Sequence, residues 1–386
     1  MNNKRFINKL EKIDTPFYFY DMDLLRKTLK SVTEEAGKFG YKVHYALKAN
    51  FSERILAEVK KFNIGADCVS GGEVKRALDC EIPASEIVFA GVAKSDAEIR
   101  IGLQNDIFSF NCESREEIEV INVIAGEMGK KARIALRINP DVDPMTHKYI
   151  STGKAENKFG ISYDEIDGVI NELQSLKNIE LIGIHFHIGS QIRDLSVFKK
   201  LSERVNAIQE WFDKQGIKIS NVNVGGGLGI DYDDPEGEPM PDFKSYFEVF
   251  HNNLKLRDGQ TLHFELGRSI VAQCGSLITK VLYNKINGQG MKIVLVDAGM
   301  TDLIRPALYQ AKHRIENLSA EPNKNEHYMV AGPICESSDV FAKDVELPVT
   351  KRGDLLELMS AGAYGRCMAS NYNLRKFPDE VFSDEL

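Results

Sequence analysis

Short apolar runs alternate with longer amphipathic runs through the first two thirds of the chain. A short apolar run is typical of a buried strand, and the helical periodicity that follows it predicts a helix. Eight such strand candidates precede Gly267, at residues 43–47, 65–70, 87–91, 106–111, 132–139, 179–188, 219–224 and 261–266. Nearly all of them are followed by a helix candidate, as a (β/α)8 TIM-type barrel requires. An open, doubly wound sheet is the alternative, but eight regular units favour a closed barrel.

The pattern changes after Gly267, where strand-like runs dominate and long helical patterns are few. The strand candidates there are residues 269–283, 291–297, 327–331, 345–349 and 354–359. These runs predict a separate C-terminal β-rich domain. Residues 17–20 also form a strand candidate, which could pair with either domain. We therefore expect a barrel over residues 23–266 and a β-rich domain formed by residues 1–22 and 267–386.

Composition narrows the class of protein. A chain of 386 residues is too long for one core of usual size, and its 43% hydrophobic and 27% charged content is that of a globular protein. The net charge of −8 argues against a nucleic-acid partner. The N-terminus carries no secretory signal pattern, and no apolar run approaches membrane-spanning length. Since the six cysteines show no close pairing either, we expect a cytoplasmic protein with free thiols and no zinc site.

Polar residues occur where the predicted barrel strands end. They are Lys48, Asp67, Ser70, Arg137, Asn139, His185, His187, Ser190, Glu265 and Arg268. In a (β/α)8 barrel the catalytic groups gather at this face, because its loops line one open end. One such residue would mean little, but their convergence on one rim predicts an active site.

Lys48 stands at the end of the first strand candidate. A lysine in that position can be partly desolvated, which lowers its pKa and frees the amine for Schiff-base chemistry. An isolated strand-end lysine more often points into water. The other residues of the rim favour the chemical role.

Three consecutive glycines, Gly225, Gly226 and Gly227, end the seventh strand candidate. Glycine lets the backbone approach a bound group and point several N–H donors at it, which suits a phosphate. A flexible turn is an equal alternative for this run alone. No Gly-Lys-Ser/Thr follows, so the run is not the P-loop of a nucleoside triphosphatase, and a small phosphorylated cofactor anchored also by Arg268 fits better.

His185 and His187 are two residues apart, so on a strand they share one face. A metal site is disfavoured, because only Asp67 and Glu265 offer further ligands; structural histidines or a plate beneath a planar cofactor fit better. Glu265 could keep a ring nitrogen protonated and the ring an electron sink. A lysine amine, a phosphate cradle, a ring support and a ring-nitrogen acid together indicate pyridoxal 5′-phosphate.

Seven segments resemble, in the same order, the motifs of the diaminopimelate decarboxylase family, which belongs to the fold-type-III, alanine-racemase-like pyridoxal-phosphate enzymes. They are residues 45–50, 187–191, 225–229, 265–268, 305–309, 335–337 and 362–365, which read YALKAN, HIGSQ, GGGLG, ELGR, RPALY, CES and GAYG. The resemblance implies a (β/α)8 barrel followed by a β-domain, and a homodimer with each active site at the subunit interface. Leu266 departs from the pattern, since many relatives have proline there, but it changes no reacting group.

The resemblance also implies residue roles. Lys48 would form the Schiff base, His187 would stack on the pyridine ring, and Glu265 would pair with the ring nitrogen. The expected cofactor-binding residues are Lys48, Asp67, Arg137, His187, Ser190, Gly225, Gly226, Gly227, Glu265, Gly267, Arg268 and Tyr364. The expected substrate-binding residues are Arg268, Arg305, Tyr309, Glu336 and Tyr364. Cys335 would donate the proton, and with Glu336 it would reach over from the partner subunit.

The expected reaction is decarboxylation of meso-2,6-diaminopimelate to L-lysine and carbon dioxide, the last step of lysine biosynthesis. The second amino-acid head of this substrate needs a cation for its carboxylate and an acid for its amine, and Arg305 and Glu336 can supply them. A decarboxylase of lysine, ornithine or carboxynorspermidine is the alternative. An amino-acid racemase is disfavoured because racemases of this fold place an arginine at the ring nitrogen. A non-catalytic relative of this fold, acting as a binding protein, is a third possibility, against which Lys48 and Cys335 speak.

Overall fold

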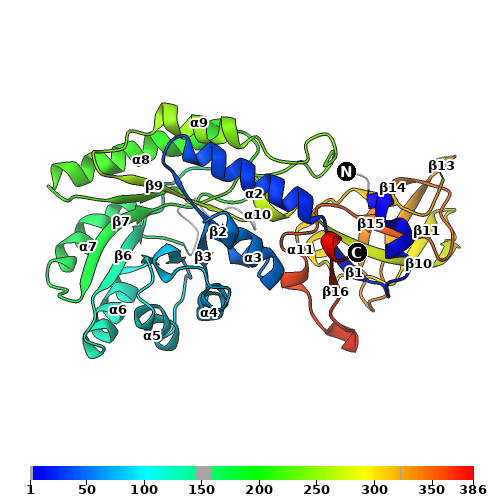
Figure 1. Ribbon diagram of the computed structural model, residues 1–386, viewed down its shortest axis with the longest axis horizontal. Coiled ribbons are helices and arrows are strands. Elements are labelled where there is room, and N and C mark those ends of the chain that lie inside the picture. Colours follow the sequence, from blue (N-terminus) through cyan, green and yellow to red (C-terminus); the bar gives the residue numbers. More distant parts are fainter. Residues whose placement is uncertain (1–2, 144–158, 322–323) are drawn as a thin grey trace. The chain divides into compact units, whose positions relative to one another are not determined.

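The computed structural model describes residues 3–143, 159–321 and 324–386 (Figure 1). These residues form two compact units. The barrel unit contains residues 29–229 and 242–267, and the β-rich unit contains residues 1–28, 230–241 and 268–386. Residues 23–28 and 230–241 thus group with the β-rich unit, although the sequence pattern assigned them to the barrel. The physical reason for the second range is that Tyr232 and Asp234 contact arginines of the β-rich unit.

Eight parallel strands close the barrel, which confirms the (β/α)8 prediction and excludes the open sheet. The strands are β2 (Lys42–Ala46), β3 (Gly65–Cys68), β4 (Ile87–Phe89), β5 (Ser109–Cys112), β6 (Ala132–Arg137), β7 (Ile179–His185), β8 (Asn221–Asn223) and β9 (Thr261–Leu266). The first and last strands join in parallel register, with His44 opposite Glu265. Most strand residues are buried, as expected of strands packed inside and covered by helices outside.

Helices follow the barrel strands and lie outside them (Figure 1). They are α3 (Glu53–Lys61), α4 (Gly71–Asp79), α5 (Asp96–Gln104), α6 (Arg115–Glu127), α7 (Ile166–Leu173), α8 (Ser196–Lys214) and α9 (Phe243–Asn253); α2 (Met22–Gly37) precedes β2. Three of them begin at a Ser-x-x-Glu sequence whose serine accepts a hydrogen bond from the backbone N–H of the glutamate. One of these serines is Ser70, so its side chain caps α4.

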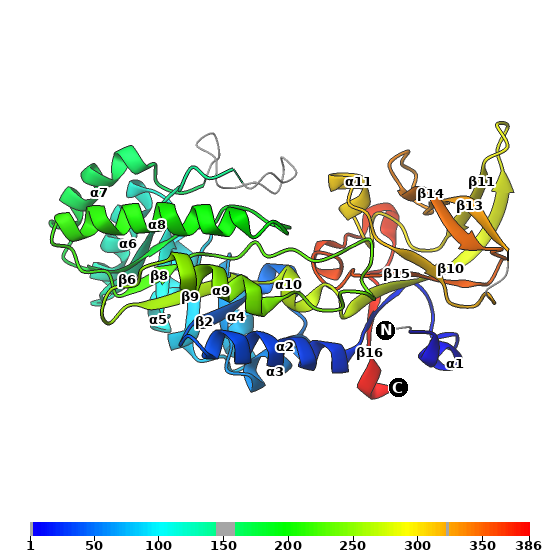
Figure 2. The ribbon, with the colours of Figure 1, turned by 90° about the horizontal axis from the view of Figure 1, so that it is seen from above.

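The β-rich unit is built on an eight-stranded sheet (Figure 2). Its strands are β1 (Phe17–Tyr20), β10 (Gly275–Ile286), β11 (Lys292–Val296), β12 (Ile315–Asn317), β13 (Asn325–Ala331), β14 (Val340–Pro348), β15 (Leu355–Leu358) and β16 (Asp379–Phe382). β1 pairs with β10 and with β16, which settles the placement of residues 17–20. The prediction of a β-rich domain is confirmed, except that residues 268–271 form a short helix, α10, before β10 begins at Gly275.

Other elements of the unit are short. They are α1 (Ile7–Leu10), α11 (Arg305–Tyr309) and several single turns of 3-10 helix. None of the helices in the described ranges combines the length and the apolar character needed to cross a membrane. Those ranges also hold no group of three potential metal ligands, and all six cysteines are free thiols.

Candidate active site

Lys48 lies just beyond its strand. β2 ends at Ala46, and the lysine sits in a turn of 3-10 helix formed by Leu47–Ala49. Its Nζ is 3.3 Å from Oδ2 of Asp67 in β3, and 34% of its side chain is exposed while that of Asp67 is wholly buried. Burial, with the nearby charge of Glu265, raises the pKa of Asp67 to about 6 despite the opposing effect of Lys48. The barrel thus holds a half-buried amine beside an acid that titrates near neutrality.

Glu265 occupies the centre of the barrel end with three hydrogen-bond donors around its carboxylate. The side-chain amides of Asn111 and Asn223 donate to Oε1 at 3.1 and 2.8 Å, and Nε2 of His185 lies 3.0 Å from Oε2. Burial alone would raise the pKa of Glu265. The charge and hydrogen bond of His185, with the charge of Lys48, outweigh burial and hold this pKa well below its usual range. Glu265 is therefore an ionised, buried carboxylate.

The glycine turn approaches its neighbours too closely for any side chain. An added Cβ at Gly226 would overlap the carbonyl oxygen of Glu265, and one at Gly225 would overlap that of Phe186. The backbone N–H of Gly226 donates to Nδ1 of His187 at 3.3 Å, and Gly227 packs against the carbonyl of Gly189, next to Ser190. The structure thus brings His187, the glycine turn and the loop of Ser190 together.

His187 itself lies beyond β7, which ends at His185, so the two histidines have different partners. Burial, followed by the charges of Lys48 and Arg137, holds the pKa of His187 well below its usual value. The ring is therefore neutral at physiological pH. A neutral imidazole can support a planar ring without adding charge to it.

Arg137 ends β6 as a buried ion pair with Glu113, and its guanidinium lies 4.7 Å above the ring of Phe159. Glu113 also accepts a hydrogen bond from the backbone N–H of Gly160 at 2.8 Å. Sequence reasoning missed Glu113, because a glutamate between a strand and a helix looks like one of the acidic residues that commonly occur at the start of a helix. Its pairing with Arg137 becomes visible only when β5 and β6 are neighbours.

The contact of Gly226 with Glu265 gives a first prediction. Gly226→Ala should lower the free energy of unfolding by about 1–3 kcal/mol, because the added methyl forces the backbone of β9 to move. Chemical denaturation of the two proteins measures this change. Gly168→Ala in α7 is the matched control, since no atom lies within 4 Å of its added Cβ, and it should be neutral or stabilising. Equal stability of Gly226→Ala and the parent protein would contradict the close approach.

A cluster of arginine and tyrosine side chains lies in the β-rich unit. Arg268 donates to the hydroxyl of Tyr232 at 2.6 Å and stacks 4.9 Å above the ring of Tyr364. The guanidinium of Arg305 lies 4.8 Å from the centre of the Tyr232 ring. Both arginines are buried, with 6% and 5% exposed area. Tyr232 was not predicted, and it joins the two arginines in one cationic, aromatic cluster.

His313 also contacts Arg305. Its Nε2 is 2.9 Å from the Arg305 guanidinium and its Nδ1 is 2.8 Å from the carbonyl of Met359. Burial, with the charge of Arg305, lowers the pKa of His313 to about 3. Because a guanidinium can only donate, Nε2 accepts and Nδ1 donates to Met359. Among the residues that the structure describes, Arg305 makes no ion pair with a carboxylate, so its positive charge is available to an anion.

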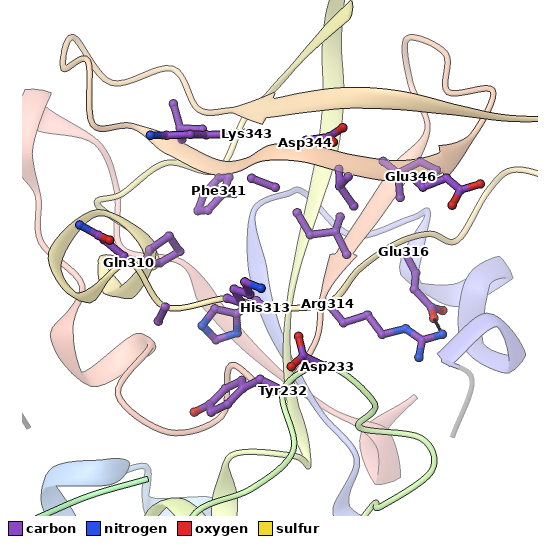
Figure 3. Close-up of a pocket in the computed structure, with 18 of the residues that line it drawn as sticks. Tyr232, Asp233, Gln310, His313, Arg314, Glu316, Phe341, Lys343, Asp344 and Glu346 are labelled. Atoms are coloured by element: carbon purple, nitrogen blue, oxygen red, sulfur yellow. Dashed lines mark ion pairs between the residues drawn. The ribbon is translucent and has the colours of Figure 1, made fainter. Parts of the chain in front are cut away.

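Figure 3 shows Tyr232 and His313 next to each other in the wall of a cavity of about 1260 Å³. Arg314 lies in the same wall and is turned toward Glu316, with which it forms an ion pair of 2.8 Å. It also pairs with Asp234. Arg314 is therefore neutralised within the chain, in contrast to Arg305.

Cys335 and Glu336 are exposed in the β-rich unit. The backbone N–H of Cys335 donates to the side chain of Asn373, and the hydroxyl of Tyr372 donates to Glu336 at 2.9 Å. Tyr309 is half-buried at the end of α11. These contacts fix the Cys-Glu segment on the surface of its own unit.

The barrel residues fit pyridoxal phosphate on observations of this structure. Oδ1 of Asp67 is buried and makes no hydrogen bond within the described part of the chain, so it can accept one from a ligand. The backbone of the glycine turn lies so close to its neighbours that a Cβ would overlap them, and Glu265 is ionised and able to accept a hydrogen bond from a protonated ring nitrogen. The half-buried amine of Lys48 is of the kind that can bind an aldehyde.

Comparisons with known proteins agree with this geometry. The family model described as "Pyridoxal-dependent decarboxylase, pyridoxal binding domain" matches residues 22–272. The diaminopimelate decarboxylase of Bacteroides thetaiotaomicron is 54% identical over 381 residues, which cover 98% of each chain. That of Aquifex aeolicus is 40% identical over 368 residues, which cover 95% of this chain and 86% of the relative.

Solved structures show the same architecture. The crystal structure of diaminopimelate decarboxylase from Helicobacter pylori complexed with L-lysine superposes with a TM-score of 0.92 at 40% identity, covering 99% of this chain and 94% of that chain. The arginine decarboxylase of Paramecium bursaria Chlorella virus shares the fold at 23% identity, with a TM-score of 0.87, covering 98% of this chain and 100% of that chain. From the matched pyridoxal-binding domain and the full-length identity, the chain belongs to the diaminopimelate decarboxylase family of pyridoxal-phosphate-dependent enzymes.

Proposed function

We propose that this enzyme decarboxylates meso-2,6-diaminopimelate to L-lysine and carbon dioxide, with pyridoxal 5′-phosphate as cofactor. The observation that carries the substrate assignment is Arg305, a buried guanidinium held by His313 and Tyr232 without a carboxylate partner in the described ranges. Diaminopimelate keeps a distal carboxylate that such a cation binds, whereas lysine and ornithine, as substrates, have none. A decarboxylase of lysine or ornithine would bury the positive charge of Arg305 without an anionic partner, which would cost stability.

When bound, pyridoxal phosphate supplies a ring that accepts the electrons left at Cα as carbon dioxide departs. Lys48 would bind the cofactor covalently through Nζ, with Asp67 beside that amine. Glu265 would accept a hydrogen bond from the ring nitrogen and keep that nitrogen protonated, and His187 would support the ring face. Arg137, Ser190, Gly225, Gly226, Gly227, Gly267, Arg268 and Tyr364 would hold the phosphate or its surroundings.

On the substrate, Arg305, Arg268, Tyr309 and Tyr364 would bind the distal carboxylate, and Glu336 would hold the distal amine. Cys335 would donate a proton to Cα from its thiol. The exposure of Cys335 and Glu336 supports a homodimer in which each chain lends these two residues to its partner's site. The six free thiols support a reducing, cytoplasmic compartment, and the net charge of −8 supports the absence of a nucleic-acid partner.

A substrate panel tests the proposal. Purified protein with pyridoxal phosphate is offered meso-diaminopimelate, L-lysine, L-ornithine and carboxynorspermidine separately, and the amine products are identified. Turnover of diaminopimelate alone supports the assignment. Turnover of another amine with diaminopimelate inert would keep the cofactor but overturn the substrate.

Subunit mixing tests the shared site. Lys48→Ala and Cys335→Ala should each be nearly inactive alone, because each lacks one half of the machinery. Mixed in equal amounts and allowed to exchange subunits, they should regain roughly a quarter of wild-type activity, because half of the dimers then carry one intact site. No recovery, with exchange verified by mass spectrometry, would place Cys335 and Lys48 in the same chain's site.

A further inference from the structure

Asn111 and Asn223 have no part in the roles assigned above, yet both donate to the same oxygen of Glu265. Their amides lie 3.1 and 2.8 Å from Oε1. Both side chains are buried, with 1% and 5% exposed area. Two neutral donors on one carboxylate oxygen at the centre of a barrel require an explanation.

A second contact fixes the orientation of each amide. The hydroxyl of Ser109 donates to Oδ1 of Asn111 at 3.2 Å, and the backbone N–H of Gly225 donates to Oδ1 of Asn223 at 2.9 Å. An amide whose oxygen accepts on one side must present its NH₂ group on the other. Both asparagines are therefore committed donors toward Glu265, and Asn223 also ties Glu265 to the first glycine of the turn.

The remaining capacity of Glu265 follows from its acceptor count. An ionised carboxylate can accept about four hydrogen bonds, two at each oxygen. Oε1 has both of its donors, whereas Oε2 receives one from His185. Because the carboxylate can only accept, Nε2 of His185 carries the proton. Within the described residues, one acceptor position is thus left, and it belongs to Oε2.

We propose that Asn111 and Asn223 are positioning residues that turn the open acceptor position of Glu265 toward the ring nitrogen of pyridoxal phosphate. Asn223 in addition sets the distance between that carboxylate and the phosphate-binding glycine turn. This inference rests on the proposed cofactor and goes beyond the residue roles given above. It requires no substrate, so it can be tested on cofactor binding alone.

The test adds a second negative charge beside Glu265 and follows how its effect changes with pH. The groups that face Glu265 from the packed elements are Lys48, Asp67, His185, His187, His44 and His263. Asn223→Asp keeps an oxygen for Gly225 but puts a second carboxylate against Oε1. Two carboxylates in contact share one proton, so the pair is tolerated at low pH and repels when both ionise. Asn223→Ala removes both contacts and adds no charge.

The affinity of the cofactor-free protein for pyridoxal phosphate is titrated by absorbance between about pH 6 and pH 9 for both variants. For Asn223→Asp we expect near-parental affinity at the acid end and a loss of about 10- to 100-fold at the alkaline end, relative to the parent at each pH. For Asn223→Ala we expect a loss of similar size that does not change with pH. Asn111→Asp should show the same pH-dependent loss of affinity, although Asn111 makes no hydrogen bond to the glycine turn. This variant replaces Asn223→Asp in the test if Asn223→Asp does not fold.

Asn317→Asp is the matched control, because this buried asparagine also donates to a carboxylate, that of Asp354, at 2.9 Å in the β-rich unit. It should bind the cofactor as the parent does. Parental affinity of Asn223→Asp at every pH, or a loss that is equal at every pH, would overturn the proposal. Failure of the substrate panel with normal titration curves would instead reject only the substrate.

Discussion

Lys48→Ala is expected to abolish turnover and to yield a colourless protein, whereas the parent protein is expected to be yellow with covalently bound cofactor. The amine lies 3.3 Å from Asp67 at the end of the barrel, and Lys48 is the one lysine among the residues assigned to the proposed site, so no other assigned side chain can form a Schiff base. Losing covalent catalysis together with the proton transfers of the same amine should cost at least about 10⁴-fold in kcat. Visible absorbance and carbon dioxide release measure the two effects.

Lys61→Ala is the matched control for this experiment. Its ammonium lies 2.9 Å from Glu58 in the same helix of the barrel, and 60% of its side chain is exposed. Colour and turnover should stay at the parental level, because Lys61 is not among the residues assigned to the proposed site and its side chain is mostly exposed. A yellow and active Lys48→Ala protein would remove the basis of the proposed mechanism.

Arg305→Leu should change which substrate the enzyme accepts. We expect kcat/KM for meso-diaminopimelate to fall by about 100- to 1,000-fold, since a buried charge pair with the distal carboxylate is worth roughly 3–4 kcal/mol. Most of the loss should appear in KM, because the distal carboxylate is bound equally before and during the reaction. Any slow turnover of L-lysine, which has no distal carboxylate, should be unchanged. Steady-state kinetics of the parent and the variant give kcat/KM for each of the two substrates.

Arg314→Leu provides the comparison for Arg305. This arginine is nine residues later in the same unit, but Glu316 and Asp234 neutralise it within the chain. Its removal should leave both kinetic constants close to those of the parent. An equal loss in the two variants would mean that Arg305 contributes only to the stability of the β-rich unit. Retention of full activity by Arg305→Leu would reject the proposed binding of the distal carboxylate.

The barrel was predictable because its signal is local. Each strand is a short buried run, and the polar residues at or just beyond its end, such as Glu265 and Lys48, are placed at the same end of the barrel by the parallel arrangement. The strand and helix limits were less accurate. Residues 269–274 have strand-like composition but begin with the helical turn α10, and the short polar strands β12 and β16 gave no apolar pattern.

The residues that the sequence did not reveal are those whose roles depend on pairing across the fold. Asn111 and Asn223 look like ordinary strand-end polar residues until the closed barrel brings β5 and β8 close to Glu265 on β9. Glu113 looks equally ordinary until β5 and β6 lie side by side and it pairs with Arg137. His313 and Tyr232 are far apart in the chain, and nothing local connects them with Arg305. Such contacts arise from tertiary packing, which hydrophobic periodicity does not encode.

The most direct test of the central claim is the product balance from meso-diaminopimelate. Purified protein loaded with pyridoxal phosphate is incubated with this substrate, and carbon dioxide and the configuration of the lysine formed are measured together. The account predicts one molecule of carbon dioxide for each molecule of L-lysine. Carbon dioxide without lysine, or a change of configuration of the substrate without carbon dioxide, would contradict it.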